Sequence, residues 1–282
     1  MKFTQPNAKI FIPDSLEAKT ALKRTTHLVV GAHHDDLEIM GIDGILQCFQ
    51  QKDKWFSGVV VTDGRGSARS GPYANYTDEE MMLVRIQEQE KAAVIGEYGS
   101  QIFLDYPSSA VKDGQNQAPV KDIENIIRMA SPKIMYTHNL ADKHLTHIGV
   151  VVKTIQAIRN LPEKERPQKL YGCEVWRDLD WVLDTEKVIF DCSERPNLQE
   201  ALLGVYDSQI SGGKRYDLAT MGRRIANATY FASHDVDEST GMTVALDLTP
   251  LIKDPSLDLN QFVQAYICRF AQNVTELINT VM

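Results

Sequence analysis

Four consecutive residues, His33-His34-Asp35-Asp36, combine side chains that bind metal ions with side chains that move protons. They come directly after the apolar run 28–32, which predicts a buried strand that ends at these four residues. In a parallel α/β sheet, ligands bind outside the carboxyl ends of the strands. Two adjacent carboxylates at such a place repel each other and lose water, and a bound cation or hydrogen bonds must offset that unfavourable free energy. The four residues therefore predict half of a metal site.

A second group of the same kind follows the apolar run 133–137 and contains His138, Asp142, His144 and His147. The carboxyl ends of neighbouring parallel strands meet at one edge of a sheet. We therefore expect the two groups to converge on one ion.

The predicted metal ligands are His33, Asp36 and His147. Zinc accepts imidazole nitrogen and carboxylate oxygen, and a catalytic zinc has three protein ligands and an open position for water. His33 and Asp36 lie in one turn and can face one point, while His147 lies at the start of the following helix. His138, at the strand end, is the alternative ligand. One Zn²⁺ is expected for each chain, although a site of two histidines and one aspartate accepts other divalent ions as well.

Three further residues are predicted to take part in the reaction. Asp35 lies beside a ligand and can take a proton from water as a general base; its alternative role is a helix N-cap. His144 precedes His147 by about one helical turn, so both rings can face the site; the alternative is a surface histidine. Asp142 is expected to accept a hydrogen bond from the His144 ring and to keep that ring charged.

The elements that position these residues are strands and helices in alternation, as hydrophobic periodicity indicates. The predicted strands are 9–12, 26–32, 57–62, 101–104, 133–137, 170–175 and 187–191. The predicted helices are 38–52, 78–95, 120–130, 146–159, 196–206 and 216–230. This order predicts an α/β fold, a Rossmann-like, doubly wound, mostly parallel sheet.

The chain of 282 residues is expected to form one domain, 1–282, with a catalytic core at about 26–210. A small mixed C-terminal extension, 211–282, is predicted to contain an edge strand at 242–246 and an amphipathic helix at 259–281. Thr77 and Glu80 have the spacing of a capping box at the start of the helix 78–95.

Composition narrows the class of protein. Apolar residues make up 43% of the chain and charged residues 24%, as in ordinary globular proteins. The net charge of −8 disfavours nucleic acid and anionic membranes as partners. No apolar run is long enough for a membrane span or a signal peptide, so a cytoplasmic location is expected. The four cysteines, Cys48, Cys173, Cys192 and Cys268, are scattered and are expected to be reduced thiols.

Two other uses of a doubly wound sheet fit the sequence poorly. Dinucleotide binding requires a glycine-rich turn after the first strand, but here that turn carries two carboxylates, which repel pyrophosphate. Gly64-x-Gly66 comes only after the second predicted strand of the core. A serine hydrolase requires a glycine elbow around its nucleophile, and His234 in Ser-His-Asp has none.

The two groups resemble the motifs of the PIG-L/LmbE-like family of zinc-dependent N-deacetylases. The family's Ala-His-Pro-Asp-Asp reads Ala-His-His-Asp-Asp here, at 32–36, and its Asp-x-His-Pro-Asp-His reads Asp-Lys-His-Leu-Thr-His, at 142–147. An Arg-x-x-Glu match lies at Arg85 and Glu88, and a Ser-Gln match at 208–209. The resemblance covers about 26–210. It departs from the family at His34 and at 145–146, where Pro and Pro-Asp are replaced.

The resemblance implies a hydrolase that removes an N-acetyl group from a small molecule containing N-acetylglucosamine. Zinc would activate water and Asp35 would be the base, zinc and a protonated His144 would stabilise the oxyanion, and Arg85 would contact the substrate. Arg85 could instead form an ordinary ion pair on the helix surface. The expected partner is an amino-sugar substrate, without nucleic acid or membrane insertion, and the chain could form a homo-oligomer. Two alternatives are a metal-dependent hydrolase of a different amide conjugate and a catalytically weak protein that binds metal or sugar.

Overall fold

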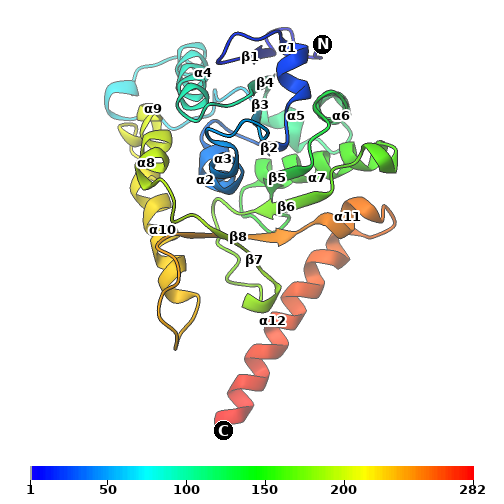
Figure 1. The fold of residues 1–282 in the computed structure, drawn as a ribbon, viewed down its shortest axis with the longest axis vertical. Coiled ribbons are helices and arrows are strands. Elements are labelled where there is room, and N and C mark those ends of the chain that lie inside the picture. Colours follow the sequence, from blue (N-terminus) through cyan, green and yellow to red (C-terminus); the bar gives the residue numbers. More distant parts are fainter. Residues whose placement is uncertain (1) are drawn as a thin grey trace.

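Eight strands form a single sheet in the computed structural model, which describes residues 2–282 (Figure 1). Their order across the sheet is β1-β4-β3-β2-β5-β6-β8-β7. The strands are β1 (Lys9–Phe11), β2 (His27–Gly31), β3 (Phe56–Thr62), β4 (Ser100–Tyr106), β5 (Ile134–His138), β6 (Lys169–Cys173), β7 (Val188–Asp191) and β8 (Met242–Asp247). The five central strands are parallel, and β1, β8 and β7 are antiparallel to their neighbours. The predicted α/β class with a mostly parallel sheet is confirmed.

Helices cover both faces of this sheet. They are α1 (Ala18–Lys23), α2 (Asp36–Met40), α3 (Ile42–Cys48), α4 (Asp78–Ile95), α5 (Ser108–Lys112), α6 (Ala118–Ala130), α7 (Leu145–Asn160), α8 (Pro196–Gly204), α9 (Asp207–Ile210), α10 (Tyr216–Tyr230), α11 (Thr249–Lys253) and α12 (Leu259–Val281). Helix α12 extends away from the body of the molecule (Figure 1). None of the helices in the described residues has the length and apolar character of a membrane span.

The central strands are buried on both faces, which explains their unbroken apolar sequences. Along β2, Leu28 and Val30 belong to one hydrophobic cluster and Val29 to the other. On β3, Val59 and Val60 likewise pack into opposite clusters. The sheet is therefore a rigid middle layer, and its strand ends are fixed relative to one another.

The order of the strands reverses between β2 and β5. The chain leaves β2 toward β3 and β4 on one side and continues from β5 to β6 on the other. A crevice forms outside the carboxyl ends of the strands at such a switch point. Residues 33–36 follow β2 and residues 139–147 follow β5, so the topology places both predicted groups at this crevice.

Three local predictions differ from the structure. The predicted helix 38–52 is two helices, α2 and α3, divided at Gly41. A β-carbon at Gly41 would lie 2.6 Å from a Val29 methyl group, so only glycine lets the chain pass so close to β2. Helix α5 is not among the predicted helices. The predicted edge strand 242–246 is not at the edge, because β8 pairs with both β6 and β7 and leaves β7 outermost.

The start of α4 agrees with the sequence. The Thr77 hydroxyl accepts a hydrogen bond from the Glu80 amide, and the Glu80 carboxylate accepts one from the Thr77 amide. The predicted capping box is therefore present. It fixes the beginning of the helix that carries Arg85 and Glu88.

The loop after β6 is held by a buried carboxyl group. Glu174 accepts hydrogen bonds from the Leu179 amide at 2.7 Å and from the Trp181 indole at 3.0 Å. Burial raises the pKa of Glu174 to about 7, against the lowering effect of these two donors. The pKa of Glu174 is thus higher in the folded chain, at about 7, than in the unfolded chain, at 4.5. Protonation of Glu174 therefore favours the folded chain between these two pH values.

We expect the free energy of unfolding to contain a contribution from Glu174 that is fully present below pH 4.5 and is lost as the pH rises through about 7. The variant Glu174→Gln cannot titrate, so its free energy of unfolding should fall less than that of the wild type between these pH values. Urea unfolding at a series of pH values measures the difference. Glu163→Gln, at an exposed position, is the control and should follow the wild type. Identical pH profiles for all three proteins would contradict the assignment.

Candidate active site

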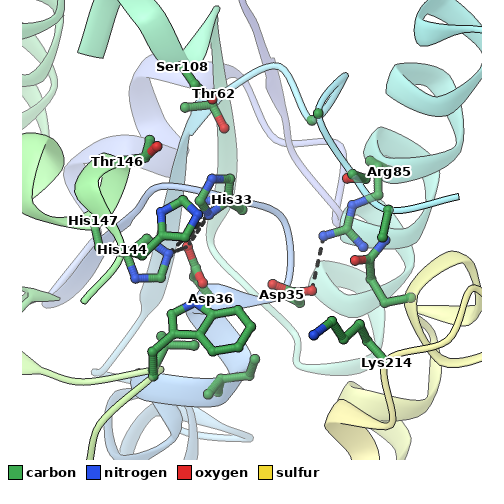
Figure 2. Close-up of a pocket in the computed structure, with 18 of the residues that line it drawn as sticks. His33, Asp35, Asp36, Thr62, Arg85, Ser108, His144, Thr146, His147 and Lys214 are labelled. Carbon is green, nitrogen blue, oxygen red and sulfur yellow. Dashed lines mark hydrogen bonds and ion pairs between the residues drawn. The ribbon is translucent and has the colours of Figure 1, made fainter. Parts of the chain in front are cut away.

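His33, Asp36 and His147 meet at the crevice between β2 and β5. The His33 Nδ1 lies 3.1 Å from the His147 Nε2 and 3.3 Å from the Asp36 Oδ2, and the last two atoms are 3.5 Å apart. Figure 2 shows the three side chains pointing toward one another at one side of the pocket. His33 comes from the turn after β2, Asp36 from the first turn of α2 and His147 from the first turn of α7.

These three atoms have the spacing that a tetrahedral metal site requires. Tetrahedral ligands at about 2.1 Å from a metal lie about 3.4 Å from one another. Burial favours the neutral form of Asp36, but the nearby His147 and His138 hold the pKa of this carboxyl well below its usual range. The Asp36 carboxylate is therefore charged, as a ligand must be. The donor set fits a divalent metal ion of the zinc type.

Asp142 fixes the orientation of His147. Its Oδ2 lies 3.0 Å from the His147 Nδ1, which leaves the Nε2 free to face His33 and Asp36. Carboxylates in this position set the tautomer and the basicity of a metal-binding histidine. Asp142 was expected to bond to the ring of His144, but it contacts His144 only through that residue's backbone amide, at 3.1 Å. The reason is local: His144 precedes the first turn of α7, whereas His147 lies within it.

His138 lies behind these residues. Its Nε2 accepts a hydrogen bond from the Ala32 amide at 2.8 Å, and its ring stacks on that of His147 with centroids 3.9 Å apart. Asp36, His138 and His147 also form a group that could hold a metal ion, as do His33, His144 and His147. The amide of Ala32 uses the lone pair of His138 that faces Asp36, so His33 is better placed as the third ligand.

Asp35 is buried and lies between Asp36 and Arg85 (Figure 2). Its backbone is in the left-handed region, with φ of 93°, a conformation that costs about 1–3 kcal/mol for a residue other than glycine. The Gln89 side chain accepts a hydrogen bond from the Asp35 amide at 3.2 Å. Burial raises the pKa of Asp35 to about 6, and the nearby guanidinium of Arg85 opposes this rise. The contacts hold Asp35 beside Asp36 but turned away from it.

Arg85 is not free to leave this arrangement. It is 2% exposed and pairs with Asp35 at 3.0 Å and with Glu88 at 3.4 Å. The Ser208 amide and hydroxyl both donate to Glu88, and the Gln209 side chain donates to Ser208. The two weaker sequence matches, Arg-x-x-Glu and Ser-Gln, thus belong to one network. Within it Arg85 is first a partner of Asp35, and it also lines the pocket.

His144 lines the mouth of the site between His33 and Trp176. Its ring meets that of His33 edge-on, with centroids 5.0 Å apart, and lies nearly parallel to that of Trp176 at 6.4 Å. Burial and the nearby His147 lower the pKa of His144 to about 4. The ring is therefore neutral near pH 7, in contrast with the protonated ring that the sequence suggested, because no carboxylate contacts it among the described residues.

The pocket around these residues has a volume of about 430 Å³. The metal-binding group, Asp35, Arg85 and His144 all line it. Small polar residues and an aromatic pair complete its walls; they are Thr62, Ser67, Ser108, Gln209, Trp176 and Tyr216. Trp176 and Tyr216 meet edge-on with centroids 6.1 Å apart. Two lysines, Lys112 and Lys214, also reach the pocket.

Sequence reasoning missed the residues that support Asp35 from behind. Glu38 is fully buried, and its carboxyl group accepts hydrogen bonds from Gln89, Tyr98 and Tyr206. Gln89 in turn holds the amide of Asp35. A usable signal was present: Arg85, Glu88 and Gln89 form one polar face of a helix whose buried positions also include apolar residues.

Of the residues that depart from the family motifs, His34 and Thr146 are buried and Leu145 is exposed. His34, in place of Pro, is 1% exposed, stacks on Phe103 and has no hydrogen-bond partner for either ring nitrogen among the described residues. Burial lowers the pKa of His34 well below its usual value, so the ring is neutral. Thr146 is buried beside His147 and lines the pocket.

The fold has known counterparts. One is N,N'-diacetylchitobiose deacetylase from Pyrococcus horikoshii, which is 15% identical, with a TM-score of 0.55 over 78% of this chain and 83% of that one. Another is GalB, the 4-carboxy-2-hydroxymuconate hydratase from Pseudomonas putida KT2440, which is also 15% identical, with a TM-score of 0.58 over 79% of this chain and 95% of that one. At this identity the likeness concerns the fold alone.

Comparison of sequences indicates the reaction class more specifically than comparison of folds does. The chain is 28% identical to the uncharacterized deacetylase YaiS of Escherichia coli K12 over 155 residues, which cover 53% of this chain and 77% of that protein. The PIG-L family profile, described as GlcNAc-PI de-N-acetylase, matches residues 28–158. That span contains both groups of site residues, so the resemblance expected from the motifs is confirmed. Residues 28–158 are thus similar to the PIG-L family of deacetylases.

Proposed function

We propose that this protein is a zinc-dependent N-deacetylase that releases acetate from a small molecule containing N-acetylglucosamine. The observation that carries the proposal is the close approach of His33, Asp36 and His147, with Asp35 facing the same pocket. The PIG-L family profile and the deacetylase YaiS support the reaction class. The amino-sugar substrate is supported by the family's description and by the pocket, where Trp176 offers a ring on which a sugar can stack.

His33, Asp36 and His147 would hold the Zn²⁺. When bound there, the ion supplies a Lewis acid that lowers the pKa of water to about 7 and polarises a carbonyl group. Asp35 accepts a proton from the attacking water molecule. A bond forms between the water oxygen and the carbonyl carbon, and the bond between that carbon and the amide nitrogen breaks. Asp35 then gives the proton to the leaving nitrogen, so that the products are acetate and a free amine.

The remaining residues position these groups. Arg85 and Gln89 hold Asp35 in its left-handed conformation, so that its carboxylate stays in the pocket. A neutral His144 at the pocket mouth can donate a hydrogen bond to the developing negative charge on the carbonyl oxygen. Ser67, Ser108 and Gln209 offer hydrogen bonds to sugar hydroxyl groups.

The first test is acetate release by the purified protein from a panel of N-acetylglucosamine derivatives and of N-acetyl compounds without a sugar. We expect release that a chelator abolishes and added Zn²⁺ restores, with the sugar compounds as the better substrates. Preference for the compounds without a sugar would replace the proposed substrate class. Absence of release from every compound, with zinc bound to each chain, would refute the deacetylase proposal.

Asp35→Asn tests the proton transfer. The substitution preserves the shape of the side chain but removes the base, so kcat should fall by about 10²–10⁴-fold. Zinc content should remain that of the wild type, because Asp35 is not one of the proposed ligands. Asp63→Asn changes the charge equally at the same edge of the sheet and should keep kcat within about threefold. A kcat for Asp35→Asn near that of the wild type would exclude Asp35 as the base.

Asp142→Asn tests the orientation of His147. An amide cannot stabilise the His147 ring as a carboxylate does, so the affinity for Zn²⁺ should fall by about 10–100-fold. Competition with a chromogenic chelator measures this affinity without reference to activity. Asp113→Asn, an exposed substitution, is the control. Unchanged zinc affinity for Asp142→Asn would mean that His147 is not a metal ligand.

A further inference from the structure

Helix α12 leaves the body of the molecule and ends far from it (Figure 1). Near its start, Phe262 and Tyr266 pack against the core. No residue of α12 is buried, and exposure increases toward its end, where Leu277 is 60% and Val281 85% exposed. Contiguous apolar surface on a protein in water commonly marks a contact with another molecule.

The apolar residues of α12 follow a regular pattern. Val263, Ile267, Phe270, Val274, Leu277 and Val281 are separated alternately by four and three residues, and we call these six residues the α12 seam. This is the heptad spacing with which two helices pack side by side. The residues that contact the core, Phe262 and Tyr266, lie on an adjacent stripe. Val263 and Phe270 are half-buried, and Phe270 lines a pocket against the body of the protein. The other four residues of the α12 seam are exposed, so packing within the chain accounts for only part of it.

The charges on α12 allow an identical helix to approach. The helix contains one cation, Arg269, and one anion, Glu276, and neither belongs to the α12 seam. Arg269 is already paired with Glu186 at 2.6 Å. The chain as a whole has a net charge of −8, so two copies repel each other over most of their surface. The uncharged α12 seam is a place where this repulsion is absent.

We propose that the α12 seam is the interface of a homodimer, in which α12 of one copy packs along α12 of a second copy. Burial of one aliphatic side chain removes about 60–120 Å² from water. The α12 seams of two copies thus bury on the order of 1,000 Å², which is the area that a specific interface needs. A two-fold dimer is also the commonest assembly of identical chains. The pairing extends over about 27 Å of helix, from Val263 to Val281.

A membrane surface is a less suitable partner for the α12 seam than a second copy of the chain. Helices that lie on membranes carry lysine and arginine on their polar face. Helix α12 has a single arginine, and the net negative charge of the chain disfavours anionic lipid. The same composition that allows a second copy to approach thus weakens attraction to lipid.

The test is the mass of the full-length protein in solution, measured by light scattering and sedimentation between about 1 and 100 μM. We expect the wild type to have the mass of two chains, at least at the upper concentrations. The double variant Val274→Glu, Leu277→Glu places charges in the α12 seam and should have the mass of one chain. The control Gln272→Glu, Asn279→Glu adds the same charges to exposed positions outside the α12 seam and should remain dimeric.

Circular dichroism and the rate of acetate release show whether the double variant keeps its fold and its distant active site. A wild type that remains a single chain throughout this range would overturn the proposal, whether or not it binds neutral lipid vesicles. An assembly whose mass is the same in the double variant and in the control would also overturn it. Because the readout is mass, failure here leaves the proposed deacetylase activity unaffected.

Discussion

Two buried carboxylates, on the adjacent residues Asp35 and Asp36, are the constraint on which the site depends. Neighbouring negative charges out of water are strongly unfavourable unless each has its own partner. Asp36 is surrounded by the rings of His33, His138 and His147. Asp35 turns the other way, through a left-handed backbone, and meets Arg85. One turn of chain can thus serve both the proposed metal centre and the proposed base, because the two carboxylates have separate surroundings.

The fold meets this constraint with elements that are far apart in the sequence. The parallel pairing of β2 with β5 brings the histidines after β5 to Asp36, while α4 supplies Arg85 and Gln89 to Asp35. Glu38, Tyr98 and Tyr206 form a further buried layer behind Gln89. Loss of these hydrogen bonds would let the Asp35 backbone leave its left-handed conformation, since that conformation is stable only where the surrounding contacts hold it. Much of the polar interior therefore acts on the position of one side chain.

The sequence could predict the features that depend on residue type and strand order. Two groups of ligand-type residues after apolar runs, in an alternating α/β pattern, are sufficient to place His33, Asp36 and His147 at one switch point. It could not predict contacts decided by the direction of a side chain. Whether Asp142 faces His144 or His147 depends on where α7 begins, and whether Arg85 reaches substrate or Asp35 depends on the depth at which α4 packs. The sequence also could not predict which of β7 and β8 lies at the edge of the sheet. Both are short apolar strands, and their order depends on which strand pairs with β6.

The same architecture occurs in a hydratase and in a deacetylase, so the sheet and its helices do not select the reaction. The reaction on such a fold depends on which side chains lie at the switch point and on the contacts that orient each of them. Here the donor atoms of His33, Asp36 and His147 have the spacing that a metal ion requires. The neighbouring carboxylate of Asp35 pairs with Arg85 instead of joining these donor atoms. In the proposed mechanism, separation of these two tasks allows the base to remain close to the cation without becoming its ligand. This arrangement is suited to hydrolysis of an amide, where one group must accept and then return a proton while another stabilises the carbonyl oxygen.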